Sequence, residues 1–115
     1  MVERRDFIPE KGDIVALVFS PKQGHEQAGK RPALVVSPSE YNRKTGLFLA
    51  CPVTSKVKGY PFEVTLPDFM TTQGVVLADQ VKSLDWKHRK AAFIEKAPEG
   101  VLGAVTGRIR LLIGE

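Results

Sequence analysis

The stretch KRPALVVSP (residues 30–38) joins two cations to four consecutive apolar residues. A short valine-rich run that ends at a proline is typical of a buried β-strand. Pro32 suits the first position of such a strand, where its missing N–H removes no ladder hydrogen bond, and it biases Arg31 toward an extended backbone. The sequence therefore predicts a core strand that begins at a cation, Arg31, whose backbone is held in an extended conformation.

The rest of the chain repeats this pattern of short β-rich runs between turn residues. Within LFLACPVTS (residues 47–55), Pro52 predicts an edge strand or a bulge. A serine at the start and a glycine at the end of SEYNRKTG (residues 39–46) indicate one helical turn or a compact loop. Further strands are predicted in residues 12–21, 62–66, 74–84 and 91–96.

The C-terminal segment changes to a helical period after Pro98. Its apolar residues fall near one face of a helix, although Gly103 and Gly107 each weaken that helix by about 1 kcal/mol relative to alanine. Five or six strands and one terminal helix predict a small β-barrel or curled sheet with a helical cap. Trp86 and the C-terminal leucines are predicted to lie in its core.

Composition sets the limits on function. The 115 residues suit one domain, and a net charge of +4 permits a polyanionic partner without requiring one. The single cysteine, Cys51, excludes an internal disulfide, and its apolar strand predicts a buried, inert thiol. No apolar run approaches the length of a membrane helix and no signal peptide is evident, so a cytoplasmic protein is expected.

Several polar residues stand at the ends of the predicted strands, and each has an ordinary structural explanation. Arg31 could be a loop cation, or its planar fork could bind a phosphate together with the hydroxyl of Thr54. The stretch KVKGYPF (residues 56–62) could be a solvated hairpin loop or a surface for single-stranded nucleic acid. No sequence motif places His25 and His88 close to each other, and this disfavours a ribonuclease mechanism that uses two histidines.

Five pieces in order carry a specific resemblance. The stretches KQGHEQAGKRPALVVSP, YNRKTG, CPVTSKVKGYPFEV and GVVLADQVKSLDW, followed by a terminal helix ending in LLIG, together resemble the MazF/PemK toxins of toxin–antitoxin pairs. The resemblance covers nearly the whole chain as one domain, residues 1–115. It implies an SH3-like small β-barrel of five to seven strands with a C-terminal helix.

The resemblance also implies an activity and partners. The expected protein is a homodimeric, metal-independent and sequence-specific endoribonuclease without a cofactor. It would cleave single-stranded mRNA by attack of the 2′-hydroxyl and leave a 2′,3′-cyclic phosphate and a 5′-hydroxyl. A MazE-type antitoxin with an acidic, disordered tail would neutralise it. Two alternatives on the same barrel are a gyrase-poisoning toxin and an RNA-binding protein without catalysis.

Residue by residue, the resemblance places the family's catalytic pair on Arg31 and Thr54, and it adds Glu26 from the first loop. Arg31 would stabilise the charge of the phosphorane, because its high pKa makes it a poor base. The group that takes the proton stays open between Glu26, His25 and Asp79. RNA binding is expected to spread over Gln27, Asn42, Lys56, Lys58, Tyr60, Gln80, Lys82 and Ser83.

Overall fold

The structure is a computed structural model, and it describes residues 7–18 and 29–114. Seven strands and a C-terminal helix make up its framework, so the predicted β-plus-α class is confirmed. In chain order the elements are β1 (Asp13–Leu17), β2 (Arg31–Val35), α1 (Ser39–Thr45), β3 (Leu47–Thr54), β4 (Glu63–Thr65), β5 (Val75–Leu77), the 3-10 helix η3 (Ala78–Gln80), β6 (Lys82–Asp85), β7 (Ala92–Lys96) and α2 (Glu99–Leu112).

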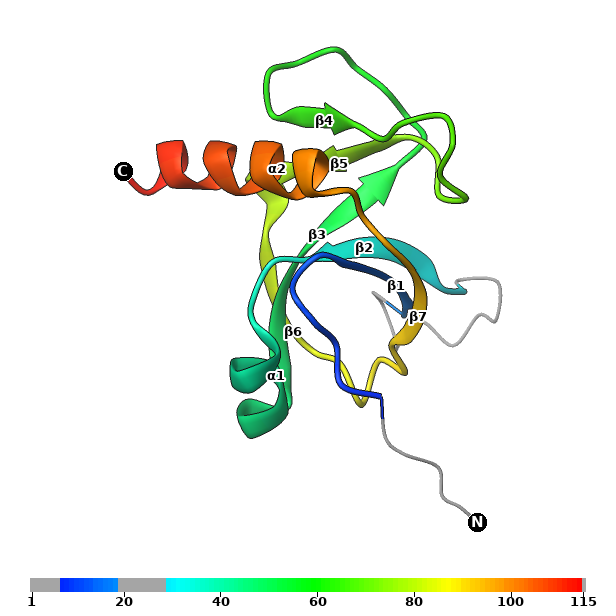
Figure 1. Cartoon of the computed structure of the whole chain (residues 1–115), viewed down its shortest axis with the longest axis vertical. Coiled ribbons are helices and arrows are strands. Elements are labelled where there is room, and N and C mark those ends of the chain that lie inside the picture. Colours follow the sequence, from blue (N-terminus) through cyan, green and yellow to red (C-terminus); the bar gives the residue numbers. More distant parts are fainter. Residues whose placement is uncertain (1–6, 19–28, 115) are drawn as a thin grey trace.

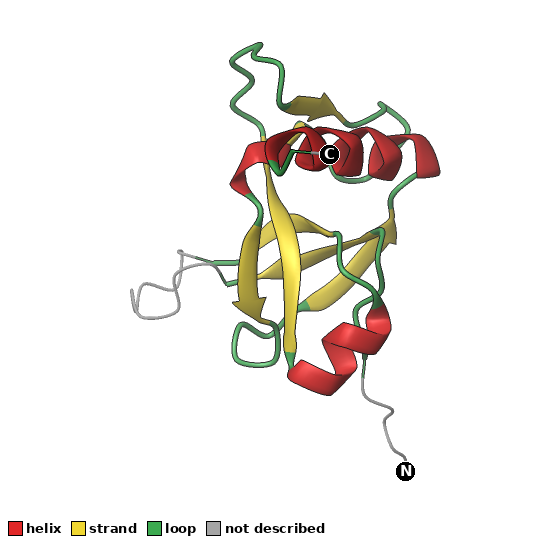
Figure 2. Cartoon of the chain, turned by 90° about the vertical axis from the view of Figure 1, so that its left-hand side faces the viewer, coloured by secondary structure: helices red, strands yellow, loops and turns green. Residues whose placement is uncertain are grey.

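All strand pairings in the described chain are antiparallel, and they follow the order β4-β5-β3-β2-β1-β7, with β6 attached to β3. Among the described residues, β4 and β7 do not pair with each other, so this path is open and the barrel that the family resemblance implied is corrected to an open sheet. Figure 1 shows the long strand β3 running through the molecule, with α2 beside β4 and β5 and α1 near the opposite end. Figure 2, turned by 90° from that view, shows most of the sheet between the two helices, while β4 lies beyond α2.

Alternation along the strands explains the two halves of the core. Ile14 and Leu34 face one cluster, which α2 completes with Val101 and Val105. Val15 and Val35 face a second cluster on the other side, which contains Phe48 and Trp86. The central strands are therefore buried on both faces, which is why they read as continuous apolar runs.

β3 differs from the prediction at Pro52. This proline lies inside a continuous, central strand opposite Ala33, and neither an edge nor a bulge occurs there. The physical reason is a change of partner. β3 pairs with β6 through Leu47–Ala50 and with β5 only from Val53 onward, so Pro52 falls between the two ladders on that side.

Two further expectations are corrected. The predicted single strand over residues 74–84 is broken into β5, η3 and β6, because the chain turns at Asp79 and Gln80 and moves from β5's position to β6's position along β3. Trp86 is in the core as expected, but Leu111 and Leu112 are 71% and 49% exposed. They lie in the last turn of α2, beyond the part that packs on the sheet.

Candidate functional site

Arg31 and Thr54 come together because of the register between β2 and β3. Ala33 pairs with Pro52 and Leu34 with Cys51. Continuing this antiparallel register by two residues sets Arg31, the first residue of β2, opposite Thr54, the last residue of β3. Both residues line one hollow, here called the Arg31 hollow, together with Pro52, Val53, Leu77, Gln80 and Lys82.

Arg31 is exposed at the rim of this hollow, while the rest of its strand is anchored. Its neighbours Ala33 and Leu34 are fully buried, and Arg31 pairs with Leu17 of β1 on the other side. The guanidinium therefore extends from a backbone that two adjacent strands hold in place. A planar, permanently charged fork in such a position can bind a phosphate in a defined orientation.

The hydroxyl of Thr54 is oriented by the backbone that follows it. Its Oγ1 accepts a hydrogen bond of 3.1 Å from the N–H of Lys56. The oxygen is used as an acceptor there, so the hydroxyl proton stays available for donation to a ligand. The local sequence Thr-Ser-Lys thus produces a turn that leaves the hydroxyl proton of Thr54 available at the hollow that Arg31 also lines.

Gly74 allows the neighbouring strand to approach Thr54. A Cβ on Gly74 would lie 2.3 Å from the Thr54 carbonyl oxygen, and the φ of this glycine is +114°. Both facts exclude an ordinary side chain, because such a contact is repulsive and such a φ is strained for L-residues. Sequence reasoning missed this residue, although a glycine directly before a β-rich run was its visible signal.

A second hollow adjoins the first and is called the Tyr60 hollow. It is lined by Thr54, Lys56, Lys58, Tyr60, Glu63, Leu77 and Gln80. Thr54, Leu77 and Gln80 therefore line both hollows. Two segments that are separate in the sequence, the loop after β3 and the 3-10 helix η3, meet here around the hydroxyl of Thr54.

Hydrogen bonds fix the loop that forms the Tyr60 hollow. The carboxylate of Glu63 accepts the N–H groups of Lys58 and Gly59, each at 2.8 Å. The Tyr60 hydroxyl donates to Asp79 at 3.0 Å, and this hydrogen bond raises the pKa of the Tyr60 phenol. Glu63 was not among the predicted site residues, since it reads as the polar side of a strand.

Seven of the eight predicted RNA-binding residues are in described positions, and they differ in their surroundings. Lys56, Lys58, Tyr60 and Gln80 line the Tyr60 hollow, and Gln80 also lines the Arg31 hollow with Lys82. Ser83 is exposed on β6 opposite Leu49 and lines neither hollow. Gln27 lies outside the described residues, as do Glu26 and His25.

Asn42 is not available for RNA, which corrects its prediction. Its side chain is fully buried. Its Oδ1 accepts from the Ser37 hydroxyl at 2.6 Å, and its Nδ2 donates to the carbonyls of Pro9 and Ser37 at 2.8 and 3.1 Å. The Asn42 amide therefore joins α1 to the N-terminal segment, and it is a structural residue.

The remaining titratable candidates have ordinary partners. The Nδ1 of His88 lies 2.8 Å from Asp85, which lowers the pKa of that carboxyl. Burial raises the pKa of the Cys51 thiol to about 12, so the predicted inert thiol is consistent with its surroundings. Within residues 7–18 and 29–114, no group of three or more His, Cys, Asp or Glu side chains is arranged to hold a metal ion.

Known proteins are similar in sequence to this chain over most of its length. The family described as "PemK-like, MazF-like toxin of type II toxin-antitoxin system" matches residues 10–113. The chain belongs to this family. The family that the sequence motifs predicted is thereby confirmed.

Relatives of this PemK/MazF family member carry names that state an activity. The chain is 46% identical over 114 residues to the endoribonuclease toxin MazF of Escherichia coli strain K12, a match that covers 99% of this chain and 100% of the relative. It is 37% identical to the endoribonuclease PemK of Escherichia coli, over 96% of this chain and 86% of the relative. The chain is thus a member of a family of endoribonucleases, as expected.

Solved structures agree with the fold. MazF of Deinococcus radiodurans is 55% identical and superposes with a TM-score of 0.87, covering 96% of this chain and 100% of its own. A MazE–MazF complex from the same organism contains a chain that is 50% identical, with a TM-score of 0.86 over 95% of this chain and 98% of its own. Among the described residues, no helix is long and apolar enough to cross a membrane.

Proposed function

We propose that this protein is a sequence-specific endoribonuclease that cleaves single-stranded mRNA at the Arg31 hollow. The observation that carries the proposal is the placement of Arg31 and Thr54 at facing strand ends of one hollow. The names of the relatives, which are endoribonucleases at up to 46% identity, support the same activity. The cytoplasm, where mRNA is present, is its proposed location.

The proposed reaction uses the 2′-hydroxyl of the substrate as the nucleophile. Its oxygen attacks the adjacent phosphorus, the bond to the 5′-oxygen of the next nucleotide breaks, and the products carry a 2′,3′-cyclic phosphate and a 5′-hydroxyl. No metal ion takes part in the proposed mechanism. The protein must align these atoms and stabilise the negative charge that develops on the non-bridging oxygens.

In the proposed mechanism, Arg31 supplies positive charge and Thr54 supplies one oriented hydrogen bond. The guanidinium of Arg31 neutralises the phosphorane through two parallel N–H groups. The Thr54 hydroxyl, oriented by the Lys56 N–H, donates to one non-bridging oxygen. Arg31 is assigned electrostatic stabilisation first and proton transfer only second, because a guanidinium is a poor general base.

The proton acceptor belongs to the first loop in this proposal. Glu26 is the proposed base, with His25 beside it as the second choice, and both lie outside the described residues. Asp79 is the third candidate, but its carboxylate already accepts a hydrogen bond from Tyr60. This contact favours a positioning role for Asp79, in which it fixes the aromatic ring of the Tyr60 hollow.

The Tyr60 hollow is the proposed place for a nucleotide next to the cleaved phosphate. Lys56 and Lys58 supply positive charge, Tyr60 supplies a ring for stacking, and Gln80 supplies an amide that can bond to a base edge. Lys82 extends the positive charge on the side of Arg31, and Ser83 and Gln27 are proposed as outer contacts.

Protein partners complete the proposal. An antitoxin of the MazE type, with an acidic and disordered tail, would neutralise the enzyme, and the similarity to chains in MazE–MazF complexes supports this. A homodimer is proposed as well. A largely apolar hollow beside α2 supports a protein contact on that face; its apolar lining residues are Val36, Leu49, Val81, Ile109 and Ile113, and Lys11, Thr106 and Arg110 complete it.

The experiment is cleavage of a long single-stranded RNA of varied sequence in EDTA, followed by mapping of both product ends. Cyclic-phosphate ends from the wild type, and their absence with Arg31→Ala, are the expected result. Arg43→Ala on α1 is the matched control, since it removes an exposed arginine outside both hollows. RNA that stays intact would overturn the proposal, and RNA that is bound but uncut would indicate a binding protein without catalysis.

A further inference from the structure

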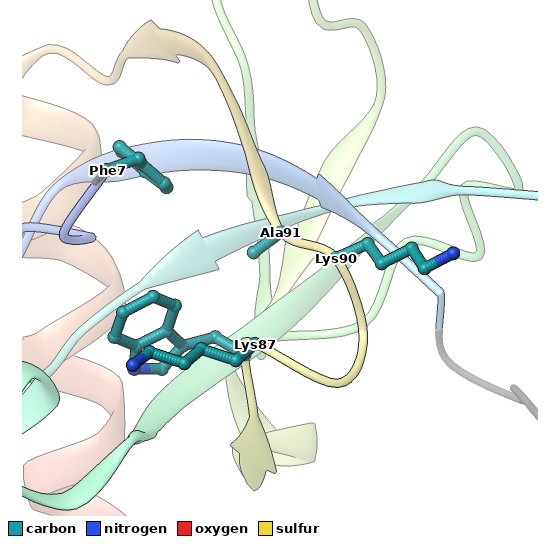
Figure 3. Close-up of a pocket in the computed structure, with 5 residues that line it drawn as sticks. Phe7, Lys87, Lys90 and Ala91 are labelled. Atoms are coloured by element: carbon teal, nitrogen blue, oxygen red, sulfur yellow. The ribbon is translucent and has the colours of Figure 1, made fainter. Parts of the chain in front are cut away.

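Another hollow lies between the turn that joins β6 to β7 and the start of the described chain. It is called the turn hollow and is lined by Phe7, Trp86, Lys87, Lys90 and Ala91 (Figure 3). Trp86 is almost fully buried and belongs to the core beneath it, while Phe7 is half-buried. The centroid of the Phe7 ring lies 6.3 Å from that of Phe93, which is itself exposed. The hollow therefore combines an apolar floor with two lysines.

The lysines carry charge that no described carboxylate neutralises. The turn has the sequence KHRK (residues 87–90), and His88 contacts Asp85. Lys87 and Lys90 are exposed, and neither forms an ion pair with a carboxylate of the described residues. The Nζ of Lys87 instead lies 5.6 Å from the centroid of the Trp86 ring. In Figure 3 the side chains of Lys87 and Lys90 extend to opposite sides of the turn.

The backbone of Lys90 is unusual for its residue type. Its φ is +54°, which makes it the sole non-glycine residue with a positive φ in the described part of the chain. The turn is closed by hydrogen bonds from the Lys90 N–H to Lys87 and from the Ala91 N–H to Trp86, each 3.0 Å long. Glycine or asparagine would occupy this conformation with less strain. The strained conformation fixes the backbone of Lys90 at the edge of the turn hollow and makes the position one to test for a function.

Hydrogen bonds connect the turn to the residues around the start of β2, the strand that begins at Arg31. The Nζ of Lys30, the residue before Arg31, donates to the Lys90 carbonyl at 3.0 Å. The Arg89 guanidinium donates to the Val18 carbonyl at 3.0 Å, and Val18 follows β1, whose last residue pairs with Arg31. Positive charge therefore continues from the Arg31 hollow through Lys30 to the turn.

We propose that the turn hollow is a second RNA-binding site, which holds the single-stranded substrate beyond the segment bound at the Arg31 hollow. Lys87 and Lys90 contact backbone phosphates there, and a base rests against Phe7. RNA is favoured over an acidic peptide because Lys30 links the turn to the residue that is proposed to bind the cleaved phosphate. This inference rests on the proposed function, and it adds affinity for long RNA without adding a catalytic group.

The experiment compares two RNAs and two double variants in EDTA. One RNA contains only the mapped cleavage sequence, and the other extends it by about ten nucleotides on each side; a 2′-deoxy sugar at the cleaved position prevents reaction in both. The test variant is Lys87→Gln/Lys90→Asn, in which asparagine tolerates the positive φ. The control is Arg43→Gln/Lys44→Gln, which removes the same charge from the last turn of α1. Affinities are measured by fluorescence anisotropy between ~50 and ~200 mM salt.

The test variant should bind the long RNA about fivefold to twentyfold more weakly than the control does at ~0.1 M salt. Its plot of log affinity against log salt should be shallower by about 1.4, since each phosphate contact on a single strand contributes about 0.7. Binding of the short RNA and its cleavage, measured with an all-ribose version, should be unchanged. Circular dichroism and urea unfolding verify that the variant is folded.

Three outcomes overturn the second site while leaving the proposed function intact. The first is a test variant that matches the control on the long RNA, and the second is an equal loss of affinity for both RNAs. The third is an unchanged RNA affinity with a loss of affinity only for a polyglutamate peptide, which would assign the hollow to an acidic protein. If the wild type neither binds nor cuts either RNA, the proposed function fails and the second site fails with it.

Discussion

Arg31 and Thr54 stand on facing ends of neighbouring antiparallel strands and line the same hollow. In the sequence they are separated by the rest of β2, by α1 and by β3 up to the residue before Thr54. The pair depends on a register in which a shift by one residue would turn each side chain to the opposite face of the sheet. Buried residues on both faces hold that register, such as Leu34 in one core cluster and Val35 in the other.

Replacement of Thr54 by valine tests the role of its hydroxyl. Valine has nearly the same shape but cannot donate, so kcat for RNA cleavage should fall about 10²- to 10³-fold, as for loss of one donor to a developing oxyanion. The change should alter RNA affinity little. Thr54→Ser, which retains the hydroxyl, should keep most of the activity. Equal rates for the valine and serine variants in single-turnover cleavage would remove Thr54 from the mechanism.

Gly74 should be intolerant of a side chain. Gly74→Ala places a Cβ 2.3 Å from the Thr54 carbonyl oxygen at a φ of +114°, so β5 or Thr54 must move. The free energy of unfolding should fall by about 2 kcal/mol or more, and kcat should fall with it. Gly103→Ala is the control, because its Cβ would meet open space on α2 and should stabilise the protein by up to about 1 kcal/mol. Urea unfolding measures both changes; a stable, fully active Gly74→Ala variant would contradict the prediction.

Asn42 should matter for stability and not for RNA. Asn42→Ala leaves the Ser37 hydroxyl and the Pro9 carbonyl without their buried partner, so unfolding should become easier by about 2–4 kcal/mol. Cleavage per folded molecule, measured well below the lowered melting temperature, should be unchanged. A specific rise in KM for RNA in a variant of normal stability would restore Asn42 to the binding surface.

We expect the buried Cys51 thiol to lower the free energy of unfolding at alkaline pH. Burial raises its pKa to about 12 in the folded protein, against 9.0 for a free thiol. Below about pH 9 the thiol is protonated in both states and has no effect. As the pH rises from there toward 12, the unfolded chain loses this proton first, so the folded state becomes less stable. Cys51→Ala should reduce that alkaline slope in urea unfolding measured between about pH 9 and pH 11.

A chemical measurement checks the same thiol at neutral pH. A thiol-specific reagent should react slowly with the native protein and at the rate of a free cysteine in urea. Fast reaction of the native protein would show that Cys51 is accessible and ionisable, contrary to its full burial.

Local sequence determined the elements of this protein. The extended start of β2 follows from Pro32, and the course of α2 follows from the period of Val101 and Val105. These features depend on the backbone preferences and on apolar patterns within a few residues, which can be read along the chain. The motifs around Arg31 and Thr54 also sufficed to predict the family.

Tertiary structure alone decided which of these residues meet. Asn42 and Gln80 are both polar residues in short helical segments, yet the Asn42 amide is buried and makes three hydrogen bonds, whereas Gln80 lines both hollows. The break of residues 74–84 at Asp79 and the close approach of Gly74 to Thr54 depend on how β3 exchanges one partner strand for another. Such pairing is determined by contacts between segments that are distant in the sequence, so it cannot be predicted from the residue types within one segment.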